Sequence, residues 1–389
     1  MRNCPLRSCA VDHDADPTTI SAISHKRGTP VENRQTENVE RTILESNSVQ
    51  EPRQLGGEMS AQGPSYTERQ LFRYLERINF PLTDPPSLPP PSIDNLRRLM
   101  ACHLQACPFE NLSLHYSSQR TIDLESEFLF DKFVNLRRGG YCMEQNRVFA
   151  TVLRSLGYDL YTVGGRVLSG LKPGEVRGFG HMAIILTFNG TEYLVDVGYG
   201  SNCLTAPLPI FNGKVIEDIQ YGVAPEQHRI HLSETPGSSK KGHKIWTLQI
   251  RRNAEAEWET QYIFEKDFEF YAADYEVYVY YWFSIVDSRM NMSTSQDPSS
   301  LFLNLLVCTN VEYDRALNAV ARNILVNSEL KKRENGETNR IKFFTTEKER
   351  LDTLRELFGI EFSPEDQEAI KGHKLAVENF DPHTQQFAF

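Results

Sequence analysis

The sequence predicts an α+β protein in which an N-terminal helical bundle precedes a sheet or barrel and then a mixed segment. Three changes of pattern support this: apolar side chains recur at helical spacing in residues 65–157, short strands follow in 158–285, and residues 286–389 combine both. Residues 1–64 are polar and poor in aromatic side chains. Such a segment buries too little apolar surface to offset the entropy of ordering, so it is predicted to be a disordered extension.

Three helices are predicted in the first folded region. A capping box at Ser65–Glu68 starts the first helix, and apolar residues follow at helical spacing. The second helix covers about Asn95–Leu104 and is ended by Pro108. The third begins after Gly139–Gly140 and is capped by Gly157.

Short strands separated by turn residues are predicted from Tyr158 onward. They cover Tyr161–Val167, His181–Phe188, Thr191–Val197, Lys244–Arg251 and Glu259–Phe264. The polar stretch Glu217–Gly242 is predicted to be a surface loop or insertion. Thr346 is a plausible cap for one amphipathic helix near the C terminus.

Composition limits the possible partners and location. Apolar residues make up 40% of the chain and charged residues 24%, without an apolar run long enough to span a membrane. The net charge of -10, without a basic stripe, argues against nucleic acid as a partner. Seven cysteines at irregular spacings, without a secretory signal, favour reduced thiols in a cytoplasmic protein.

A metal site is not expected. Cys102, His103 and Cys107 lie close together in the sequence, as zinc ligands often do. A second ligand pair at zinc-finger spacing is missing, however. No metal is therefore predicted.

Cys142 is a candidate nucleophile. It follows Gly139–Gly140, where two glycines allow a sharp entry into a helix, and is expected in the first helical turn. The partial positive charge of a helix N-terminus stabilises a thiolate, which is the reactive form of cysteine. A buried structural cysteine remains an equally good interpretation of this segment alone.

A predicted hairpin brings a histidine and an aspartate together. Asn189–Gly190 is a strong two-residue hairpin signal, and pairing about it sets Ala183 opposite Asp196. His181 shares the face of Ala183, so its imidazole is a diagonal neighbour of the Asp196 carboxylate. The carboxylate would orient the ring, whose second nitrogen could serve a thiol. Papain-like proteases and transglutaminases share this residue order, so the triad indicates a nucleophile without specifying a reaction.

Five segments together resemble the arylamine N-acetyltransferase family, and the long polar extension suggests a fungal member. They are the signature Arg138–Asn146, the pair His181–Met182, the run Asp196–Gly200, the segment Pro108–Leu112 and the C-terminal run Phe344–Glu368. The intervals of 39 and 15 residues from cysteine to histidine and from histidine to aspartate agree with the family's usual spacing. The resemblance covers the chain from about Ser65 onward.

The resemblance implies a helical bundle at 65–157, a central β-barrel at 158–285 and a C-terminal α/β lid at 286–389, around a core like that of cysteine proteases. It also implies a ping-pong reaction: acetyl-CoA, or another acyl-CoA such as malonyl-CoA, would acylate Cys142, and an arylamine or hydrazine would then accept the acyl group. His181 would move the protons and Asp196 would orient it. A thiol hydrolase of protease or transglutaminase type is the alternative reaction. No permanently bound cofactor is expected, and the protein would be a monomer or a weak oligomer.

Further site residues are implied by the same resemblance. Gly178 and Gly180 would lie along the coenzyme A channel, and Phe109 would lie near the acceptor pocket. Tyr199 occupies a position where the family commonly has phenylalanine, so its hydroxyl could alter acceptor preference. Backbone N–H groups near Tyr199 and the nucleophile would hold the oxyanion. Arg289 is a hypothetical partner for the free carboxylate of malonyl-CoA.

Overall fold

The computed structural model describes residues 63–172, 174–214, 220–275 and 300–379. The chain divides into two units, Met1–Glu58 and Met59–Phe389, and every described residue belongs to the second. The predicted disordered extension therefore lies outside the described residues, apart from its last two positions. Arg289 also lies outside them.

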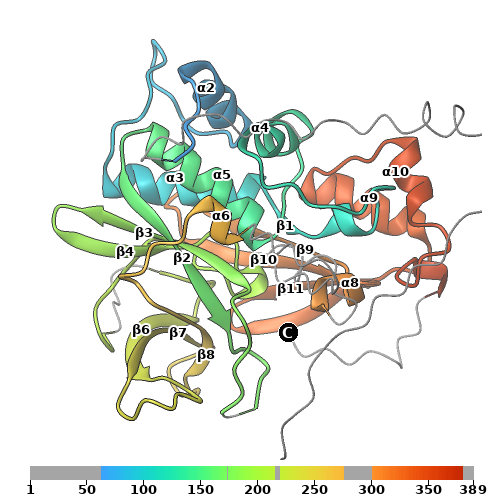
Figure 1. Cartoon of the computed structure of the whole chain (residues 1–389). Coiled ribbons are helices and arrows are strands. Elements are labelled where there is room, and N and C mark those ends of the chain that lie inside the picture. Colours follow the sequence, from blue (N-terminus) through green and yellow to red (C-terminus); the bar gives the residue numbers. More distant parts are fainter. Residues whose placement is uncertain (1–62, 173, 215–219, 276–299, 380–389) are drawn as a thin grey trace, which may run out of the picture. The chain divides into compact units, whose positions relative to one another are not determined.

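Helices form most of the first part of the second unit (Figure 1). They are α2 (Glu68–Arg77), α3 (Ile93–Ala106), the short helix η1 (Leu112–Leu114), α4 (Ser126–Phe130), η2 (Asp131–Asn135) and α5 (Cys142–Ser155). The predicted cap of the first helix was wrong: Thr67, not Ser65, accepts the hydrogen bond from the backbone of Gln70. Glutamine can complete a capping box as glutamate does, so Thr67 and Gln70 can form one. This pair lies directly before the apolar residues of the helix.

A seven-stranded antiparallel sheet follows. In the order of the sheet its strands are β5 (Leu208–Pro209), β4 (Thr191–Val195), β3 (His181–Phe188), β2 (Asp159–Val167), β8 (Glu259–Phe264), β7 (Lys244–Arg251) and β6 (Gln227–Glu234). The two edge strands, β5 and β6, are not paired with each other in the described residues. The sheet is therefore a near barrel that strand pairing does not close. The predicted loop at Glu217–Gly242 was wrong for its central part, because β6 lies there and pairs with β7.

A five-stranded sheet forms the C-terminal part. Its order is β1 (Phe109–Glu110), β9 (Val307–Tyr313), β10 (Ala319–Val326), β11 (Glu329–Glu334) and β12 (Glu337–Phe343). Since β1 comes from the helical part and pairs with β9, the two ends of the unit are joined in one sheet. The remaining short elements are η3 (Gly200–Asn202), α6 (Ala272–Tyr275), α8 (Leu301–Asn304), α10 (Pro364–Ala369) and η4 (Val377–Asn379).

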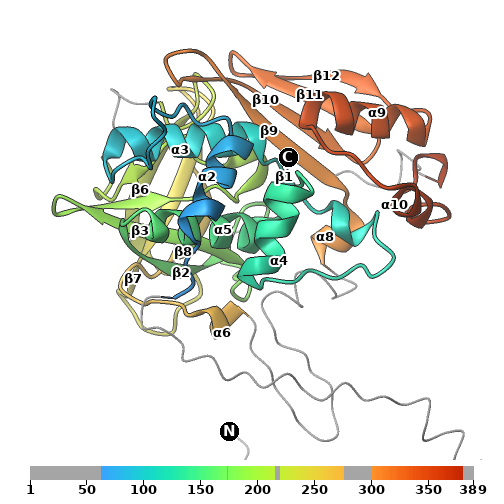
Figure 2. The same cartoon turned by 90° about the horizontal axis from the view of Figure 1, so that it is seen from above.

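Helix α9 (Glu347–Phe358) packs on this second sheet (Figure 2). The predicted cap at Thr346 is confirmed, because its side chain accepts from the backbone of Glu349. Arg350 is fully buried and donates to the carbonyls of Asn327 and Leu375, so one cation ties α9 to the segments around it. The predicted mixture of helices and strands near the C terminus is thus confirmed.

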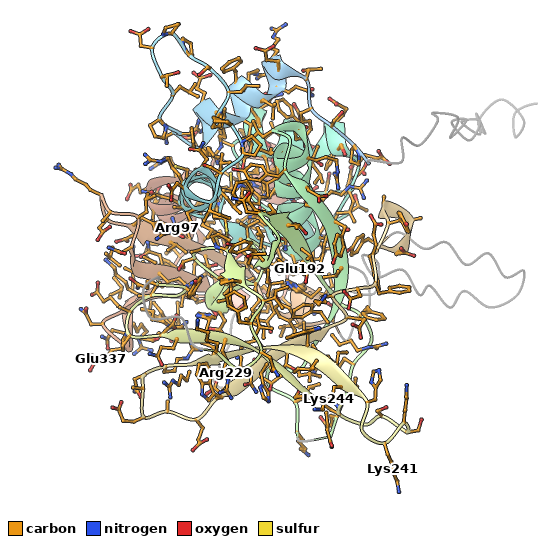
Figure 3. The ribbon with its side chains drawn as sticks, turned by 90° about the vertical axis from the view of Figure 1, so that its left-hand side faces the viewer. Arg97, Glu192, Arg229, Lys241, Lys244 and Glu337 are labelled. Carbon is orange, nitrogen blue, oxygen red and sulfur yellow. The ribbon has the colours of Figure 1, made fainter. Side chains whose placement is uncertain are left out.

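The largest apolar core lies between α2, α3 and α5 on one side and β2 to β4 on the other. Charged side chains occupy the β6–β7 hairpin, where Arg229, Lys241 and Lys244 lie at the end of the unit opposite α2 (Figure 3). Among the described residues, no helix has both the length and the apolar character needed to cross a membrane. Because α5 packs against β3, the first turn of α5 lies against the first residue of β3. The candidate site lies at this contact.

Candidate active site

Cys142 is the first residue of α5, as the sequence predicted. The helix start is fixed by Glu144, whose carboxylate accepts from the backbone N–H of Tyr141 at 3.0 Å and from Lys132 Nζ at 2.6 Å. All of these side chains are buried. A buried ion pair is costly to break because the remaining charge is left without a partner, so this pair holds the nucleophile's helical turn in place.

The two glycines before the nucleophile allow other atoms of the protein to pack close to the backbone. Neither has a positive φ, whereas Arg137 does, at 53°. A Cβ added at Gly139 would lie 1.8 Å from the carbonyl oxygen of Pro108, and one at Gly140 would lie 2.7 Å from the side chain of Glu144. The segment therefore needs glycine because another part of the backbone passes beside it.

The predicted hairpin register is confirmed where strand pairs form. Phe188 pairs with Thr191, Leu186 with Tyr193 and Ile184 with Val195. His181 is the first residue of β3, and Asp196 directly follows β4. Their side chains meet: Nε2 of His181 donates to Oδ2 of Asp196 at 2.7 Å.

Asp196 is fully buried and accepts three further hydrogen bonds. Its Oδ1 accepts from Nδ2 of Asn146 and from the backbone N–H of Gly198, both at 2.9 Å, and its Oδ2 accepts from the hydroxyl of Tyr262, also at 2.9 Å. The sequence prediction had not identified Asn146 or Tyr262. Asn146 lies one helical turn after Cys142, which is a usable signal. Tyr262 lies in a strand distant in sequence, and no local pattern reveals its role.

The histidine and the aspartate stabilise each other's charged forms. Burial alone would lower the pKa of His181, but the Asp196 charge and hydrogen bonds with Asp196 and Cys142 raise it to about 10. Burial alone would raise the pKa of Asp196, but the His181 charge and the bonds from Asn146 and Gly198 hold it below its ordinary value. The pair is therefore an imidazolium and a carboxylate at neutral pH.

The sulfur of Cys142 lies against the His181 ring and against the backbone. Because Nε2 of His181 is occupied by Asp196, the hydrogen bond with the sulfur uses the other ring nitrogen. The sulfur also lies 3.6 Å from the carbonyl oxygen of Gly180. A Cβ added at Gly198 would lie 2.7 Å from the Cα of Cys142, so the loop after Asp196 passes directly against the nucleophile. The structure thus joins the three predicted residues in one chain of contacts.

The other predicted site residues lie around this centre. Phe109 and the buried Cys142 belong to one apolar cluster. The ring of Tyr199 packs edge-on against His181 at 5.0 Å, and its hydroxyl donates to the backbone carbonyl of Gln261 at 2.9 Å. That hydroxyl is therefore committed to strand β8. A Cβ added at Gly178 or Gly180 would meet no atom within 4 Å, so both glycines border open space.

His103, which was considered as a metal ligand, has other partners. His103 is fully buried between the hydroxyl of Tyr74 at 2.7 Å and the side-chain oxygen of Gln145 at 2.6 Å. Burial lowers its pKa to about 4, so the ring is neutral. Within the described ranges, no three His, Cys, Asp or Glu side chains are grouped as metal ligands would be.

Comparisons with known proteins agree with this geometry. Residues 92–367 match a family described as N-acetyltransferase. The N-malonyltransferase FDB2 of Gibberella moniliformis is 33% identical over 339 residues, which are 79% of this chain and 93% of the relative. The solved structure of Mycobacterium marinum arylamine N-acetyltransferase in complex with CoA is similar with a TM-score of 0.61 and 30% identity, covering 77% of this chain and 98% of that one. The enzyme from Mycobacterium abscessus is similar with a TM-score of 0.62 and 25% identity, covering 77% and 93%.

Proposed function

The chain belongs to the arylamine N-acetyltransferase family, and we propose that it moves a short acyl group from acyl-CoA, through a thioester on Cys142, to the nitrogen of an arylamine or hydrazine. Family membership makes it an acyl-CoA-dependent acyltransferase. The contact chain from the Cys142 sulfur through His181 to the buried carboxylate of Asp196 is the observation that carries the thioester mechanism.

In the first half-reaction, the sulfur attacks the thioester carbonyl of acyl-CoA. The imidazolium of His181 lies beside the sulfur and stabilises the negative charge that the sulfur carries as it attacks. The new S–C bond forms as the bond between the acyl carbon and the coenzyme sulfur breaks. His181 then gives its proton to the departing coenzyme A thiolate, which leaves a neutral imidazole.

In the second half-reaction, the amine nitrogen attacks the Cys142 thioester. Neutral His181 takes a proton from the attacking nitrogen, the C–S bond to Cys142 breaks, and an amide is released. The imidazolium and thiolate are thereby regenerated. Asp196 supports both steps, because its charge stabilises the imidazolium whenever that form appears.

Two backbone positions suit the negative oxygen that develops on the acyl carbon. The N–H groups of Cys142 and Tyr199 are the proposed donors, because Cys142 heads its helix and Gly198, which precedes Tyr199, passes against the Cα of Cys142. Gly180 contacts the sulfur and borders open space, which supports a path for coenzyme A past Gly178 and Gly180. Phe109 and the Tyr199 ring would bound the acceptor pocket.

A thiol hydrolase is the competing reaction, since water could replace the amine. The similarity to transferases over more than two thirds of the chain favours the amine. The donor is acetyl-CoA or another short acyl-CoA. Because one relative is named as an N-malonyltransferase, malonyl-CoA must be tested beside acetyl-CoA.

Intact-mass analysis tests the proposal. The protein is mixed with acetyl-CoA or malonyl-CoA without an amine, and one acyl mass is expected on the peptide that contains Cys142. Adding an arylamine should remove that mass and yield the amide. The variant Cys142→Ala should take up no acyl group, whereas Cys102→Ala, which changes a half-buried thiol elsewhere, should behave as the wild type.

Three results separate the alternatives. An acyl-enzyme that decays equally fast with and without the amine would support hydrolysis. Acylation retained in Cys142→Ala would refute the thioester. The donor that labels faster at equal concentration identifies the preferred acyl group.

A further inference from the structure

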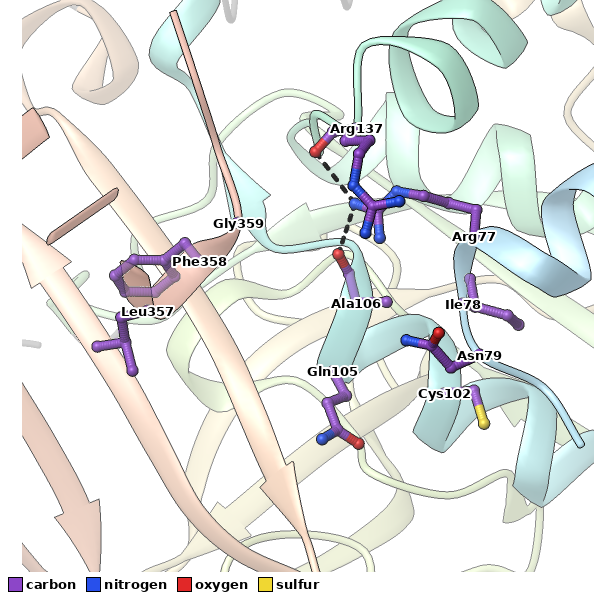
Figure 4. Close-up of a pocket in the computed structure, with 10 residues that line it drawn as sticks. All are labelled: Arg77, Ile78, Asn79, Cys102, Gln105, Ala106, Arg137, Leu357, Phe358 and Gly359. Atoms are coloured by element: carbon purple, nitrogen blue, oxygen red, sulfur yellow. Dashed lines mark hydrogen bonds between the residues drawn. The ribbon is translucent and has the colours of Figure 1, made fainter. Parts of the chain in front are cut away.

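A hollow remote from the thioester site joins three helix ends to the turn before the nucleophile. It measures about 270 Å³ and is lined by the ends of α2, α3 and α9 together with Arg137 (Figure 4). This volume suits a ligand the size of a single substituted ring and is too small for acyl-CoA. The proposed acyl transfer uses none of its lining residues.

Two guanidinium groups dominate the charge of the hollow. Arg77 is buried and donates to the carbonyls of Phe133, Ala106 and Arg137 at 3.0, 2.7 and 3.0 Å. The Arg137 side chain is exposed, and its guanidinium makes no hydrogen bond or ion pair in the described part of the chain. Burial raises the pKa of the Cys107 thiol, and both cations lower it, so both lie near that residue.

No lining residue offers a carboxylate to balance these charges. Each helix end carries a partial negative charge of about half an elementary charge. The three ends together contribute roughly -1.5, which is compared with the two positive charges of the guanidinium groups. Arg77 directs its donors to carbonyls at these ends, whereas Arg137 does not. A small positive excess therefore remains, and it is concentrated at Arg137.

The rest of the lining suits a ligand that has both a charged and an apolar end. The side-chain amides of Asn79 and Gln105 are exposed and offer further donors. Leu357 and Phe358 come from α9 and lie across the hollow from the arginines (Figure 4). Phe358 is buried in the apolar core beneath α9, so the half-buried Leu357 offers most of the apolar surface on this side.

We propose that this hollow binds small organic anions with a flat apolar body, of which an aryl carboxylate is the simplest. The carboxylate pairs with the Arg137 guanidinium, and the ring lies against Leu357. Because the charge excess is small and the hollow is open to water, the affinity is in the millimolar range. Arg137 lies five positions before Cys142, so a bound anion contacts the turn that leads into the nucleophile.

Thermal unfolding of the full chain with benzoate tests the site, with benzamide as a neutral molecule of the same shape and ionic strength held constant. At a tenfold excess over the dissociation constant, benzoate should raise the unfolding midpoint by about 2 °C, and benzamide should not. The variant Arg137→Gln should lose the effect. Arg69→Gln, which changes an exposed arginine on α2 outside the hollow, should keep it.

A second measurement locates the ligand. Cys102 lines the hollow, so benzoate should slow its alkylation by iodoacetamide in a Cys142→Ala background, read by peptide mass spectrometry. Equal stabilisation of the wild type and Arg137→Gln, no shift up to about fifty millimolar benzoate, or unprotected Cys102 despite a shift would each overturn the proposal. Neither readout involves acyl transfer, so failure of the thioester mechanism would leave this result unaffected.

Discussion

Replacing Asp196 with asparagine should disable the site without unfolding it. The asparagine side chain has the same shape and keeps an oxygen for the bonds from Asn146 and Gly198. Its amide, however, presents N–H groups toward Nε2 of His181. The ring must then accept at Nε2 and carry its proton on the nitrogen that faces Cys142, which is the wrong tautomer for taking a proton there.

The size of the effect follows from the pKa of His181. In the wild type it is raised to about 10 from an ordinary 6.5, against the opposing effect of burial. Without the charge of Asp196, burial dominates and the pKa falls below 6.5. A fall in the pKa from about 10 to 6.5 or lower corresponds to about 5 kcal/mol or more of imidazolium stabilisation. A decrease in kcat/KM of roughly 10⁴-fold is expected, as for similar substitutions in other triads.

Steady-state kinetics with the preferred acyl-CoA and one arylamine measure this decrease, and an NMR titration of the His181 ring measures the pKa. The matched control is Asp159→Asn, an exposed aspartate at the start of the neighbouring strand β2, which should be as active as the wild type. A variant Asp196→Asn that retains more than a tenth of the activity, or in which the ring still titrates near 10, would refute the reasoning.

Three further predictions follow from the same contacts. Tyr262→Phe removes one hydrogen bond to a buried carboxylate, so kcat/KM should fall about tenfold with an unchanged circular dichroism spectrum; an unchanged rate would show that this hydroxyl is dispensable. Gly198→Ala should lower both the melting temperature and the activity, by overpacking worth about 1–3 kcal/mol against Cys142, whereas Gly178→Ala should leave the melting temperature unchanged; equal melting temperatures would contradict the packing argument. Finally, in the Cys142→Ala background, where no thiol proton offsets that of His181, the folded protein keeps the His181 proton above pH 6.5, where the unfolded chain releases it. The free energy of unfolding should therefore fall as the pH rises above 6.5, by up to about 1.4 kcal/mol per pH unit. Denaturant titrations at several pH values measure this slope, and His181→Gln should flatten it.

Local patterns in the sequence were enough to place most elements. The Asn189–Gly190 turn set the register of β3 and β4, and strands β3, β7 and β8 begin and end at the predicted residues. Strand β6 was missed because its outward-facing charged side chains dominate the composition of that stretch. Only the alternation of Ile230 and Leu232 indicated a strand.

The glycines near the nucleophile show what local sequence patterns do not predict. A sharp turn was expected at Gly139 and Gly140, but neither has a positive φ. Glycine is needed at 139 because the Pro108 carbonyl lies against the backbone, and at 140 because the side chain of Glu144 does. Close approach between segments distant in sequence leaves no pattern within either segment. For the same reason, Tyr262 could not be recognised as a partner of Asp196.

The sequence by itself determined which residues form the candidate triad, because a helix start and a two-residue turn are local features whose geometry depends on a few neighbouring side chains. The tertiary structure alone decided what surrounds them: the three further donors to the buried carboxylate of Asp196, the raised pKa of His181 and the hollow at Arg137. These depend on burial and on charges brought together from separate segments. Both arise only when the chain has packed, since the removal of water is what makes each of these interactions strong.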